Sequence, residues 1–130
     1  MENKNHYHVV AAVIKEDDKY LCMQRCRSKY DYISEQWEFP GGKVEEGESH
    51  HETLIREIRE EMDWDVFVGK CLGTVEQEYP DFCITLTAYL CKGGDGEFKL
   101  LDHLDYQWLP KEELETLKWT EGDRQLLQLL

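Results

Sequence analysis

The sequence has few features that mark membrane, secreted or zinc-finger proteins. No apolar run in the 130 residues approaches the roughly 20 that a membrane-spanning helix needs. The first residues, 1–6, also lack the apolar core of a secretory signal. The five cysteines are an odd number and form no Cys-x-x-Cys pair, so we expect reduced thiols. These absences predict a cytoplasmic protein.

Positive charge is also scarce. The chain has 15 Lys and Arg against 28 Asp and Glu, which gives a formal net charge of −13. Such a charge repels nucleic acid backbones and anionic membranes, so neither is expected as a partner. A small nucleotide remains compatible with it, because divalent cations can bridge two anionic groups.

Length and composition predict one α/β domain that spans residues 1–130. The chain is 41% hydrophobic and 12% aromatic, which suffices for a core, and no repeat or linker interrupts it. Residues 25–36 are polar and are expected to form a loop that lines a substrate site. Hydrophobic patterns predict strands at 7–14, 20–24, 37–39, 66–73, 74–78, 84–91 and 106–109, and helices at 49–62, 110–117 and 120–130.

An acidic helix that follows a glycine turn is the most informative feature. At about 100° per residue, Glu57, Glu60 and Glu61 fall within roughly a 100° arc of the helix surface. Three like charges so close destabilise an isolated helix, so a cation is expected beside them. Oxygen-rich clusters of this kind suit Mg²⁺ or Mn²⁺. The alternative interpretation is a solvated acidic face, which most runs of this composition form.

The surrounding residues favour the metal-binding interpretation. The segment resembles the Nudix box, G-x5-E-x7-R-E-U-x-E-E-x-G-U, in which U is a bulky apolar residue. Asp63 stands where the family has glycine, and Asp is among the residues that tolerate the left-handed conformation expected there. Residues 37–43 and 78–81 further resemble MutT-type nucleoside triphosphate pyrophosphohydrolases. The box positions that match are Gly42, Glu48, Arg56, Glu57, Ile58, Glu60, Glu61 and Trp64.

This resemblance implies a fold, a reaction and a metal site. The fold is a Nudix α/β/α sandwich, with a mixed β-sheet between helices. The reaction is Mg²⁺- or Mn²⁺-dependent hydrolysis of a nucleoside triphosphate to the monophosphate and diphosphate. A late loop supplies a further carboxylate in such enzymes, and here Asp102 and His103 compete for that place, with Asp105 as a third candidate. The implied metal ligands are Glu57, Glu60, Glu61, a main-chain carbonyl of Gly41 or Gly42, and Asp102.

Other box residues are expected to support the ligands. Glu57 has an alternative role, as the base that takes a proton from the attacking water. Glu48 and Arg56 are implied to be part of the catalytic machinery by holding a carboxylate or the glycine loop in place.

Substrate contacts are predicted from position alone. Asp123 falls where this branch places an Asn or Asp that bonds the base edge, and Phe39 is expected at the pocket floor. Arg25 and Arg27 are candidates for contacts with the base or the phosphates. Lys43 is a candidate for a phosphate contact, and the alternative is that it faces solvent. Aromatic side chains that suit either base stacking or the core are Tyr79, Phe82 and Trp119.

The sequence does not choose among substrates, because discrimination rests on a few hydrogen bonds in the pocket. Oxidised purines such as 8-oxo-dGTP and pyrimidines such as CTP are both compatible with it. ADP-ribose, a dinucleoside polyphosphate and a non-catalytic nucleotide-binding domain are the alternatives. The protein is expected to be a monomer or a homodimer.

Overall fold

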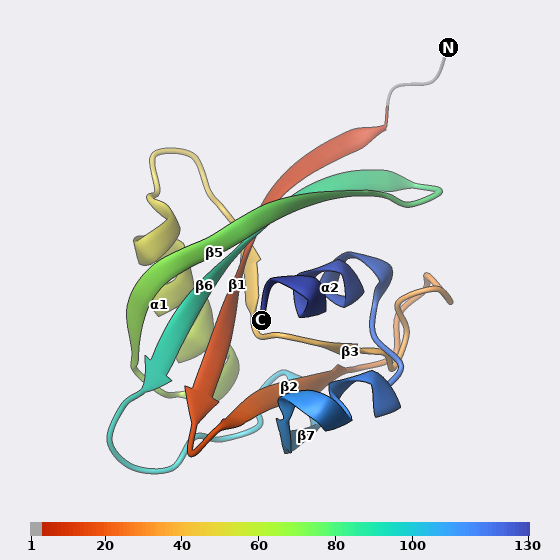
Figure 1. The fold of residues 1–130 in the computed structure, drawn as a ribbon. Coiled ribbons are helices and arrows are strands. Elements are labelled where there is room, and N and C mark those ends of the chain that lie inside the picture. Colours follow the sequence, from red (N-terminus) through yellow and green to blue (C-terminus); the bar gives the residue numbers. More distant parts are fainter. Residues whose placement is uncertain (1–3) are drawn as a thin grey trace.

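The computed structural model describes residues 4–130 (Figure 1). One seven-stranded sheet has the order β3-β2-β1-β6-β5, while β4 pairs with β1 and β7 pairs with β2. β1 and β6 are parallel and the other pairs are antiparallel, so the predicted α/β fold with a mixed sheet is confirmed. The elements are β1 (Asn5–Glu16), β2 (Lys19–Arg25), β3 (Trp37–Glu38), β4 (Gly41–Lys43), α1 (His50–Met62), β5 (Val66–Glu78), β6 (Phe82–Gly93), β7 (His103–Pro110), the 3₁₀ helix η1 (Lys111–Thr116), α2 (Glu121–Leu126) and the 3₁₀ helix η2 (Leu127–Leu129).

β1 is the central strand because its apolar run is buried on both faces. Residues 10–14 are all at most 2% exposed. Alternate side chains of a strand point to opposite faces. Val10, Ala12 and Ile14 therefore pack in one core cluster, and Ala11 and Val13 pack in another.

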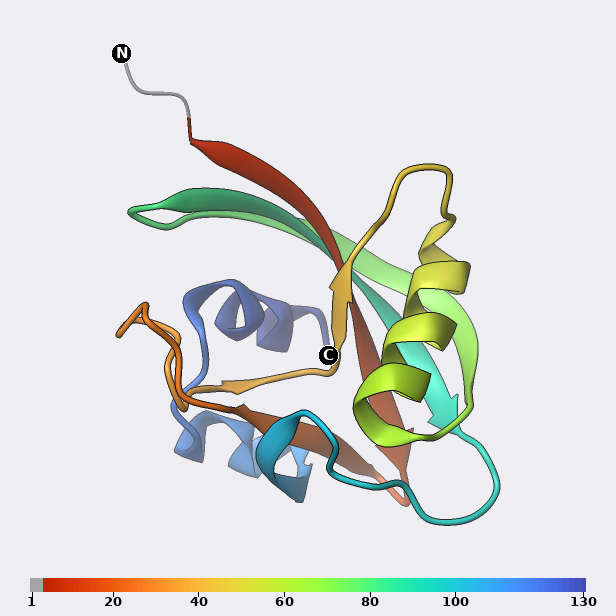
Figure 2. The ribbon, with the colours of Figure 1, turned by 180° about the vertical axis from the view of Figure 1, so that it is seen from behind.

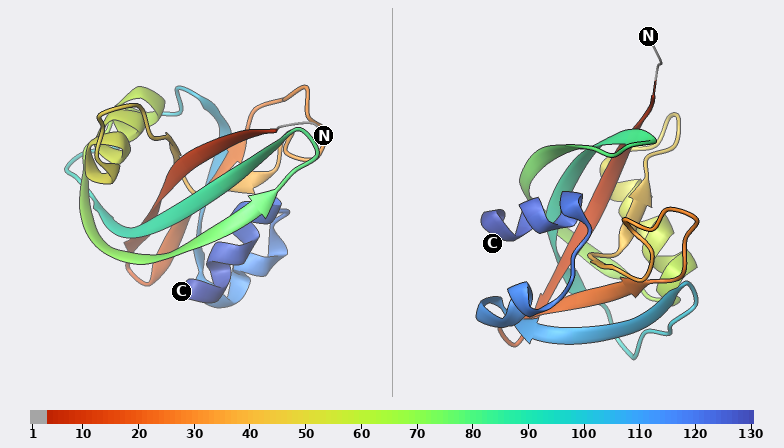
Figure 3. Two further views of the ribbon diagram at one scale, coloured as in Figure 1. Left: turned by 90° about the horizontal axis from the view of Figure 1, so that it is seen from above. Right: turned by 90° about the vertical axis from the view of Figure 1, so that its right-hand side faces the viewer.

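The two clusters lie beneath different helices. On one face, Leu54, Ile58 and Met62 of α1 join the even-numbered side chains of β1. On the other face, Trp119 and Leu126 join the odd-numbered ones. Figure 2 and Figure 3 show α1 and α2 on opposite sides of the sheet. No helix within residues 4–130 is long and apolar enough to cross a membrane.

The caps of α1 match the sequence prediction. Ser49 is the N-cap, and its side chain and that of Glu52 form a capping box with each other's backbone N–H groups. Asp63 ends the helix in the left-handed conformation, with φ 48° and ψ 47°. The residue that replaces the family's glycine thus adopts the geometry expected of that glycine.

Other local predictions need correction. Residues 41–43 form strand β4 rather than a turn, since β1 supplies its hydrogen-bonding partners. β5 is one strand whose register shifts between Val68 and Gly73, where we predicted two strands. Residues 111–116 form a 3₁₀ helix, and α2 ends at Leu126 before a second 3₁₀ turn.

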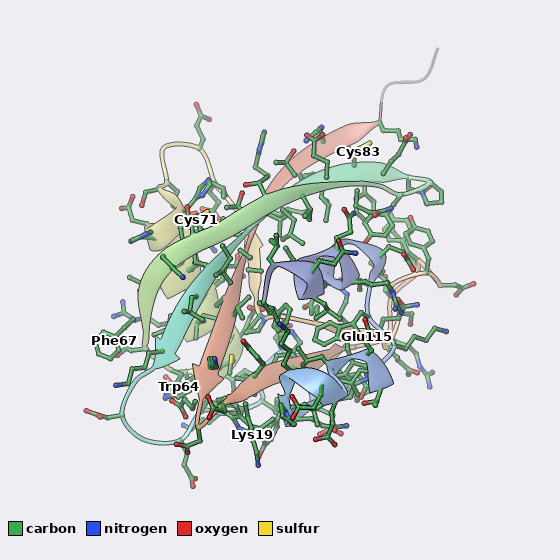
Figure 4. All side chains as sticks on the ribbon, viewed as in Figure 1. Lys19, Trp64, Phe67, Cys71, Cys83 and Glu115 are labelled. Carbon is green, nitrogen blue, oxygen red and sulfur yellow. The ribbon has the colours of Figure 1, made fainter. Side chains whose placement is uncertain are left out.

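All five cysteines are free thiols, and the structure holds no disulfide among residues 4–130. Cys22 and Cys91 are buried, and burial raises the pKa of each thiol to about 12. Cys71 and Cys83 lie on the long β5–β6 pair (Figure 4). Buried thiols with raised pKa values behave as small apolar side chains and are poor nucleophiles.

Candidate active site

A pocket of about 400 Å³ collects side chains from most parts of the chain. Its walls come from β1, β2, the loop between β2 and β3, β3, β4, α1, the β5–β6 turn, β6, the loop before β7 and α2. The sequence-predicted residues that line it are Arg25, Phe39, Gly41, Gly42, Lys43, Glu57, Glu61, Tyr79, Phe82, Asp102 and Asp123. Those that do not line it are Arg27, Glu48, Arg56, Glu60 and Trp119.

β4 brings its backbone close to β1 at Gly41 and close to the acidic side of α1 at Gly42, and both approaches require glycine. A Cβ atom at Gly41 would lie 2.0 Å from the carbonyl oxygen of Val10. A Cβ atom at Gly42 would lie 2.4 Å from the carboxyl carbon of Glu57. The Glu57 carboxylate therefore rests directly against the main chain of β4, with no side chain between them.

Arg56 lies beside this contact and gathers several acidic side chains. Its Nε donates to Glu48 Oε2 at 2.7 Å, and its Nη1 donates to Glu57 Oε1 at 2.9 Å. Nη1 also donates to Glu60 Oε2 at 3.3 Å, and Nη2 donates to the carbonyl of Lys43 at 3.2 Å. One guanidinium thus fixes Glu48, Glu57 and Glu60 to each other and to β4.

The carboxylates that Arg56 contacts differ in their pKa values and in their exposure. Hydrogen bonds from Arg56 and Thr53 lower the pKa of Glu48 to about 2. Burial raises the pKa of Glu57, and the hydrogen bond from Arg56 opposes that rise. The side chain of Glu60 is 60% exposed and turns toward Arg56 rather than into the pocket. The structure therefore does not gather all three α1 carboxylates in the pocket.

Glu61 is the most perturbed group in the site. Its side chain is buried, and its Oε2 has no hydrogen-bond partner among the described residues. Burial, together with the carboxylates of Glu38, Glu57 and Asp102, raises its pKa to about 10. A carboxylate with an unpartnered oxygen among other carboxylates is the environment that a hard cation would complete.

This environment fits a divalent cation, although the ligands are not assembled in advance. Within residues 4–130 no group of three His, Cys, Asp or Glu side chains converges closely enough to hold a metal ion. Glu57 and Glu61 face the pocket, while Glu60 is engaged by Arg56. The donor set is oxygen only, which suits hard cations.

Sequence reasoning missed Glu38, which links the two ends of the pocket. Its Oε1 accepts a hydrogen bond from Arg25 Nη1 at 2.9 Å, and its Oε2 lies 3.0 Å from His103 Nε2. His103 Nε2 is also 4.0 Å from Glu61 Oε1. Burial would raise the pKa of Glu38, but the hydrogen bond from His103 and the charge of Arg25 outweigh it and lower the pKa. The available signal was its place inside the 37–43 segment, three positions before Gly41.

The two late-loop candidates lie on different sides of the pocket wall. Asp102 is exposed and lines the pocket, and its carbonyl accepts a hydrogen bond from Cys26 Sγ at 3.3 Å. His103 is buried and contacts Glu38. Of these two residues, Asp102 is the one that offers an oxygen ligand to the pocket, and its role there stays a prediction.

Asp123 anchors α2 to the pocket floor. Its Oδ2 accepts the backbone N–H of Phe39 at 2.8 Å, and its Oδ1 accepts the Thr120 hydroxyl at 2.9 Å. Burial and the nearby Glu38 carboxylate raise the pKa of Asp123 to about 7. A buried acceptor that titrates near neutrality, beside a pocket, is a candidate for base recognition.

Aromatic rings form another part of the pocket wall. Tyr79, Phe82 and Tyr30 line the pocket, and Tyr79 lies 5.0 Å from Phe82 between ring centroids. Tyr32 stacks on Tyr79 at 5.4 Å from behind. Trp119, by contrast, is 1% exposed and is a core residue. The base-stacking candidates are thus narrowed to residues of the pocket wall.

The two arginines predicted to contact the substrate lie in different places. Arg25 lines the pocket, where Glu38 raises the pKa of its guanidinium through charge attraction. Arg27 has a 90% exposed side chain and pairs with Glu35 outside the pocket. Arg27 instead lines a smaller polar cavity of about 210 Å³ beside Cys26 and Asp102.

Comparison with known proteins shows which family the chain resembles. A model of the NUDIX domain matches residues 4–130. The chain is 36% identical over 92 residues to an 8-oxo-dGTP diphosphatase of Proteus vulgaris, covering 69% of this chain and 80% of the relative. It is 34% identical over 120 residues to the CTP pyrophosphohydrolase of Escherichia coli, covering 92% and 87%.

Solved structures agree with the sequence relatives. The solution structure of the E. coli ORF135 protein superposes with a TM-score of 0.81 and 32% identity, covering 97% of this chain and 89% of that one. The chain therefore belongs to the NUDIX domain family, as its sequence predicted. Hydrolases of this family generally need a divalent metal.

Proposed function

We propose that this protein hydrolyses a nucleoside triphosphate to the monophosphate and diphosphate with Mg²⁺ or Mn²⁺. The observation that carries the proposal is the unpartnered, buried oxygen of Glu61 beside Glu57 and Gly42, at the edge of a nucleotide-sized pocket. Relatives named as an 8-oxo-dGTP diphosphatase and a CTP pyrophosphohydrolase support the same reaction class.

The acidic end of the pocket would hold the metal and the polyphosphate. Glu57, Glu61 and Asp102 are the side chains that would bind the cation, and a carbonyl of Gly41 or Gly42 would join them. When bound, the divalent ion screens the phosphoryl oxygens and lowers the pKa of water. Glu60 would join these ligands by leaving Arg56, to which it is bonded at 3.3 Å.

The protein's own groups would position the reactants. Arg56 holds Glu57 against β4, so the carboxylate cannot swing away from the pocket edge. The raised pKa of Glu57 makes it a better proton acceptor than an ordinary glutamate, which keeps its alternative role as the base. Glu48 supports the arrangement through its 2.7 Å bond to Arg56.

The far end of the pocket would hold the nucleoside. Asp123 and the backbone of Phe39 form its floor, and Tyr79 and Phe82 offer ring faces for stacking. Arg25 lines the same space and can approach the base or a phosphate. Buried acceptors here favour a base with exocyclic N–H donors, which cytosine, guanine and adenine derivatives carry and uracil and thymine lack.

The proposal is tested by measuring diphosphate release from NTPs, dNTPs, 8-oxo-dGTP, 5-methyl-dCTP and ADP-ribose. Glu57→Gln removes a proposed ligand and is expected to lower kcat by roughly 10³-fold. Glu115→Gln is the matched control, because Glu115 is exposed on η1, outside the pocket (Figure 4). Turnover in ¹⁸O-labelled water, with the label in one product, would locate the attacked phosphorus.

Two other outcomes would change the assignment. Turnover of ADP-ribose or a dinucleoside polyphosphate alone would keep hydrolysis but replace the triphosphate substrate. Nucleotide binding without any divalent-dependent turnover would instead indicate a non-catalytic binding domain.

We further propose that residues 1–130 act as one domain in the cytoplasm, as a monomer or homodimer. Both core clusters include residues of β1, so neither is independent of the other. The free thiols agree with a reducing compartment. Light scattering at micromolar concentration measures the oligomeric state.

A further inference from the structure

The candidate active site is poor in available positive charge. Among the residues that the structure describes, five acidic side chains line the pocket and two basic ones do, Arg25 and Lys43. Arg25 is bonded to the Glu38 carboxylate at 2.9 Å, which neutralises it. The acidic side chains in that lining are Glu38, Glu57, Glu61, Asp102 and Asp123.

Lys43 differs from every other cation near the site. Arg56 is shared among acidic side chains, whereas the Lys43 ammonium has no carboxylate within ion-pair distance among residues 4–130. It lies instead over the ring of Tyr7, with Nζ 3.8 Å from the ring centroid. Both side chains line the pocket.

The sheet fixes this contact. Lys43 of β4 is opposite Val9 of β1, so Tyr7 is its diagonal neighbour two residues along β1. Side chains at such positions share a face and reach one another when they are long or aromatic. The N–H of Val44 donates to the carbonyl of His8 at 2.8 Å and locks the register.

An aromatic face holds a cation without neutralising it. A ring carries a quadrupole and no net charge, so the ammonium over Tyr7 keeps its full positive charge. A carboxylate in the same place would hold Lys43 equally well but would cancel the charge that a polyphosphate needs. The contact also restricts a flexible side chain that would otherwise explore solvent.

We propose that Tyr7 is a positioning residue, whose ring holds the ammonium of Lys43 in the pocket as the available cation for the substrate's phosphates. This inference rests on the proposed function, since it requires a polyphosphate in that pocket. Tyr7 acts on the substrate through Lys43 and not as a stacking partner for the base.

A double-mutant cycle tests the proposal. Tyr7→Ile keeps a strand-forming residue but removes the ring face, and Lys43→Met removes the charge. For the best nucleoside triphosphate, Tyr7→Ile is expected to raise KM about 3- to 10-fold with kcat changed less than about twofold. Lys43→Met is expected to raise KM at least as much, and the double variant is expected to match Lys43→Met alone.

Conservative and remote variants separate positioning from structure. Tyr7→Phe keeps the ring face and is expected to stay within about twofold of the wild-type KM. Lys15→Met is the charge-matched control, because Lys15 lies over the Tyr20 ring at 5.4 Å outside this pocket. Thermal unfolding confirms that each variant is folded, and Tyr7→Thr replaces Tyr7→Ile if the latter does not fold.

Several results would overturn the proposal. If Tyr7→Ile still raised KM in the Lys43→Met background, Tyr7 would act through another contact, such as its packing against Phe82 at 5.9 Å. An unchanged KM in Tyr7→Ile, or an equal loss in Tyr7→Phe, would also exclude the role.

The outcome is distinguishable from failure of the proposed function. Wild-type and Lys15→Met protein report triphosphate hydrolysis independently of Tyr7. The same cycle is measured as the Kd of inorganic triphosphate with Mg²⁺ by calorimetry. A chain without turnover would thus reject the proposed function, while the calorimetric cycle would still decide whether Tyr7 and Lys43 act together on a polyphosphate.

Discussion

The two ends of the pocket differ in how completely the protein satisfies its own polar groups. At the aromatic end, which would hold the nucleoside, the Tyr79 hydroxyl accepts the N–H of Gly122 at 2.9 Å, and both oxygens of Asp123 accept hydrogen bonds. At the carboxylate end, Glu61 Oε2 is buried without a partner among the described residues. The Tyr79 and Asp123 oxygens thus have partners within the protein, whereas Glu61 Oε2 and the buried Nε of Arg25 have none among the described residues. The proposed cation would complete the carboxylate end.

This difference places the electrostatic cost of the site at one end. Burial, together with the neighbouring carboxylates, raises the pKa of Glu61 to about 10, so the isolated protein must keep this group protonated or accept an unfavourable charge. Asp123 shows a smaller rise, to about 7. A group whose environment opposes its charge lowers stability, and functional sites commonly retain such groups.

Glu61→Gln tests the comparison with the largest expected effect. Activity is expected to fall by about 10³-fold, because a proposed metal ligand is lost. Stability without divalent ions is expected to change in the opposite direction. The raised pKa of Glu61 predicts that wild-type stability falls as pH rises from about 4.5 toward 10, since the unfolded state ionises first. The Glu61→Gln variant lacks this pH dependence, and its free energy of unfolding at pH 8 is expected to exceed that of the wild type by on the order of 2 kcal/mol.

The measurement is urea unfolding at pH 5 and pH 8 with EDTA and again with Mg²⁺. Mg²⁺ is expected to stabilise the wild type and to leave Glu61→Gln nearly unchanged. A variant that is less stable than the wild type in EDTA at pH 8 would show that the carboxylate end is already satisfied, and the comparison would fail.

Gly42→Ala tests the close approach of β4 to α1 and has a smaller expected effect. The added methyl would lie 2.4 Å from the carboxyl carbon of Glu57, so that side chain must move. We expect kcat to fall by roughly 10- to 100-fold and stability to fall by about 1 to 3 kcal/mol. Gly96→Ala is a poor control because its φ is 78°, so Ala88→Gly on β6 serves for a backbone change outside the site.

A loss of activity in Gly42→Ala could come from displacement of the Glu57 carboxylate or from disturbed strand pairing. Steady-state kinetics at several Mg²⁺ concentrations distinguish these two explanations. If the methyl displaces the Glu57 carboxylate, the Mg²⁺ dependence shifts to higher concentration. An unchanged Mg²⁺ dependence would place the effect in the strand pairing instead.

Sequence alone predicted the parts of the fold that depend on local interactions. α1 and both of its caps were predictable, because Ser49, Glu52 and Asp63 act within one turn of the helix ends. β4 was not predictable, because its hydrogen-bonding partner is β1, about 30 residues away in the sequence. The short helices after β7 were assigned the wrong type or length for a similar reason, since tertiary packing decides them.

The candidate site divides in the same way. The α1 residues were predicted by spacing, but the helical arc did not reveal that Arg56 draws Glu60 out of the pocket. Glu38 was missed because its partner His103 is 65 positions away. Side-chain pairing between distant strands leaves no periodic signal in a single sequence.

Asp123→Asn sharpens the comparison at the aromatic end and has the smallest expected effect. The amide can accept only one of the two hydrogen bonds that the carboxyl group accepts from Phe39 N–H and the Thr120 hydroxyl, at a cost of about 1 kcal/mol. The raised pKa of Asp123 predicts that this residue makes the wild type less stable as pH rises from about 4 to 7, because the unfolded state loses its proton first. The stability of the Asp123→Asn variant has no such pH dependence, so its deficit relative to the wild type is expected to be larger at pH 5 than at pH 8.

KM of the Asp123→Asn variant for the preferred nucleotide is expected to rise about 10-fold as the acceptor for the base edge is lost. Urea unfolding in EDTA measures the stability difference, and a deficit that is equal at both pH values would show that Asp123 is ionised throughout, as at an ordinary, fully satisfied carboxylate.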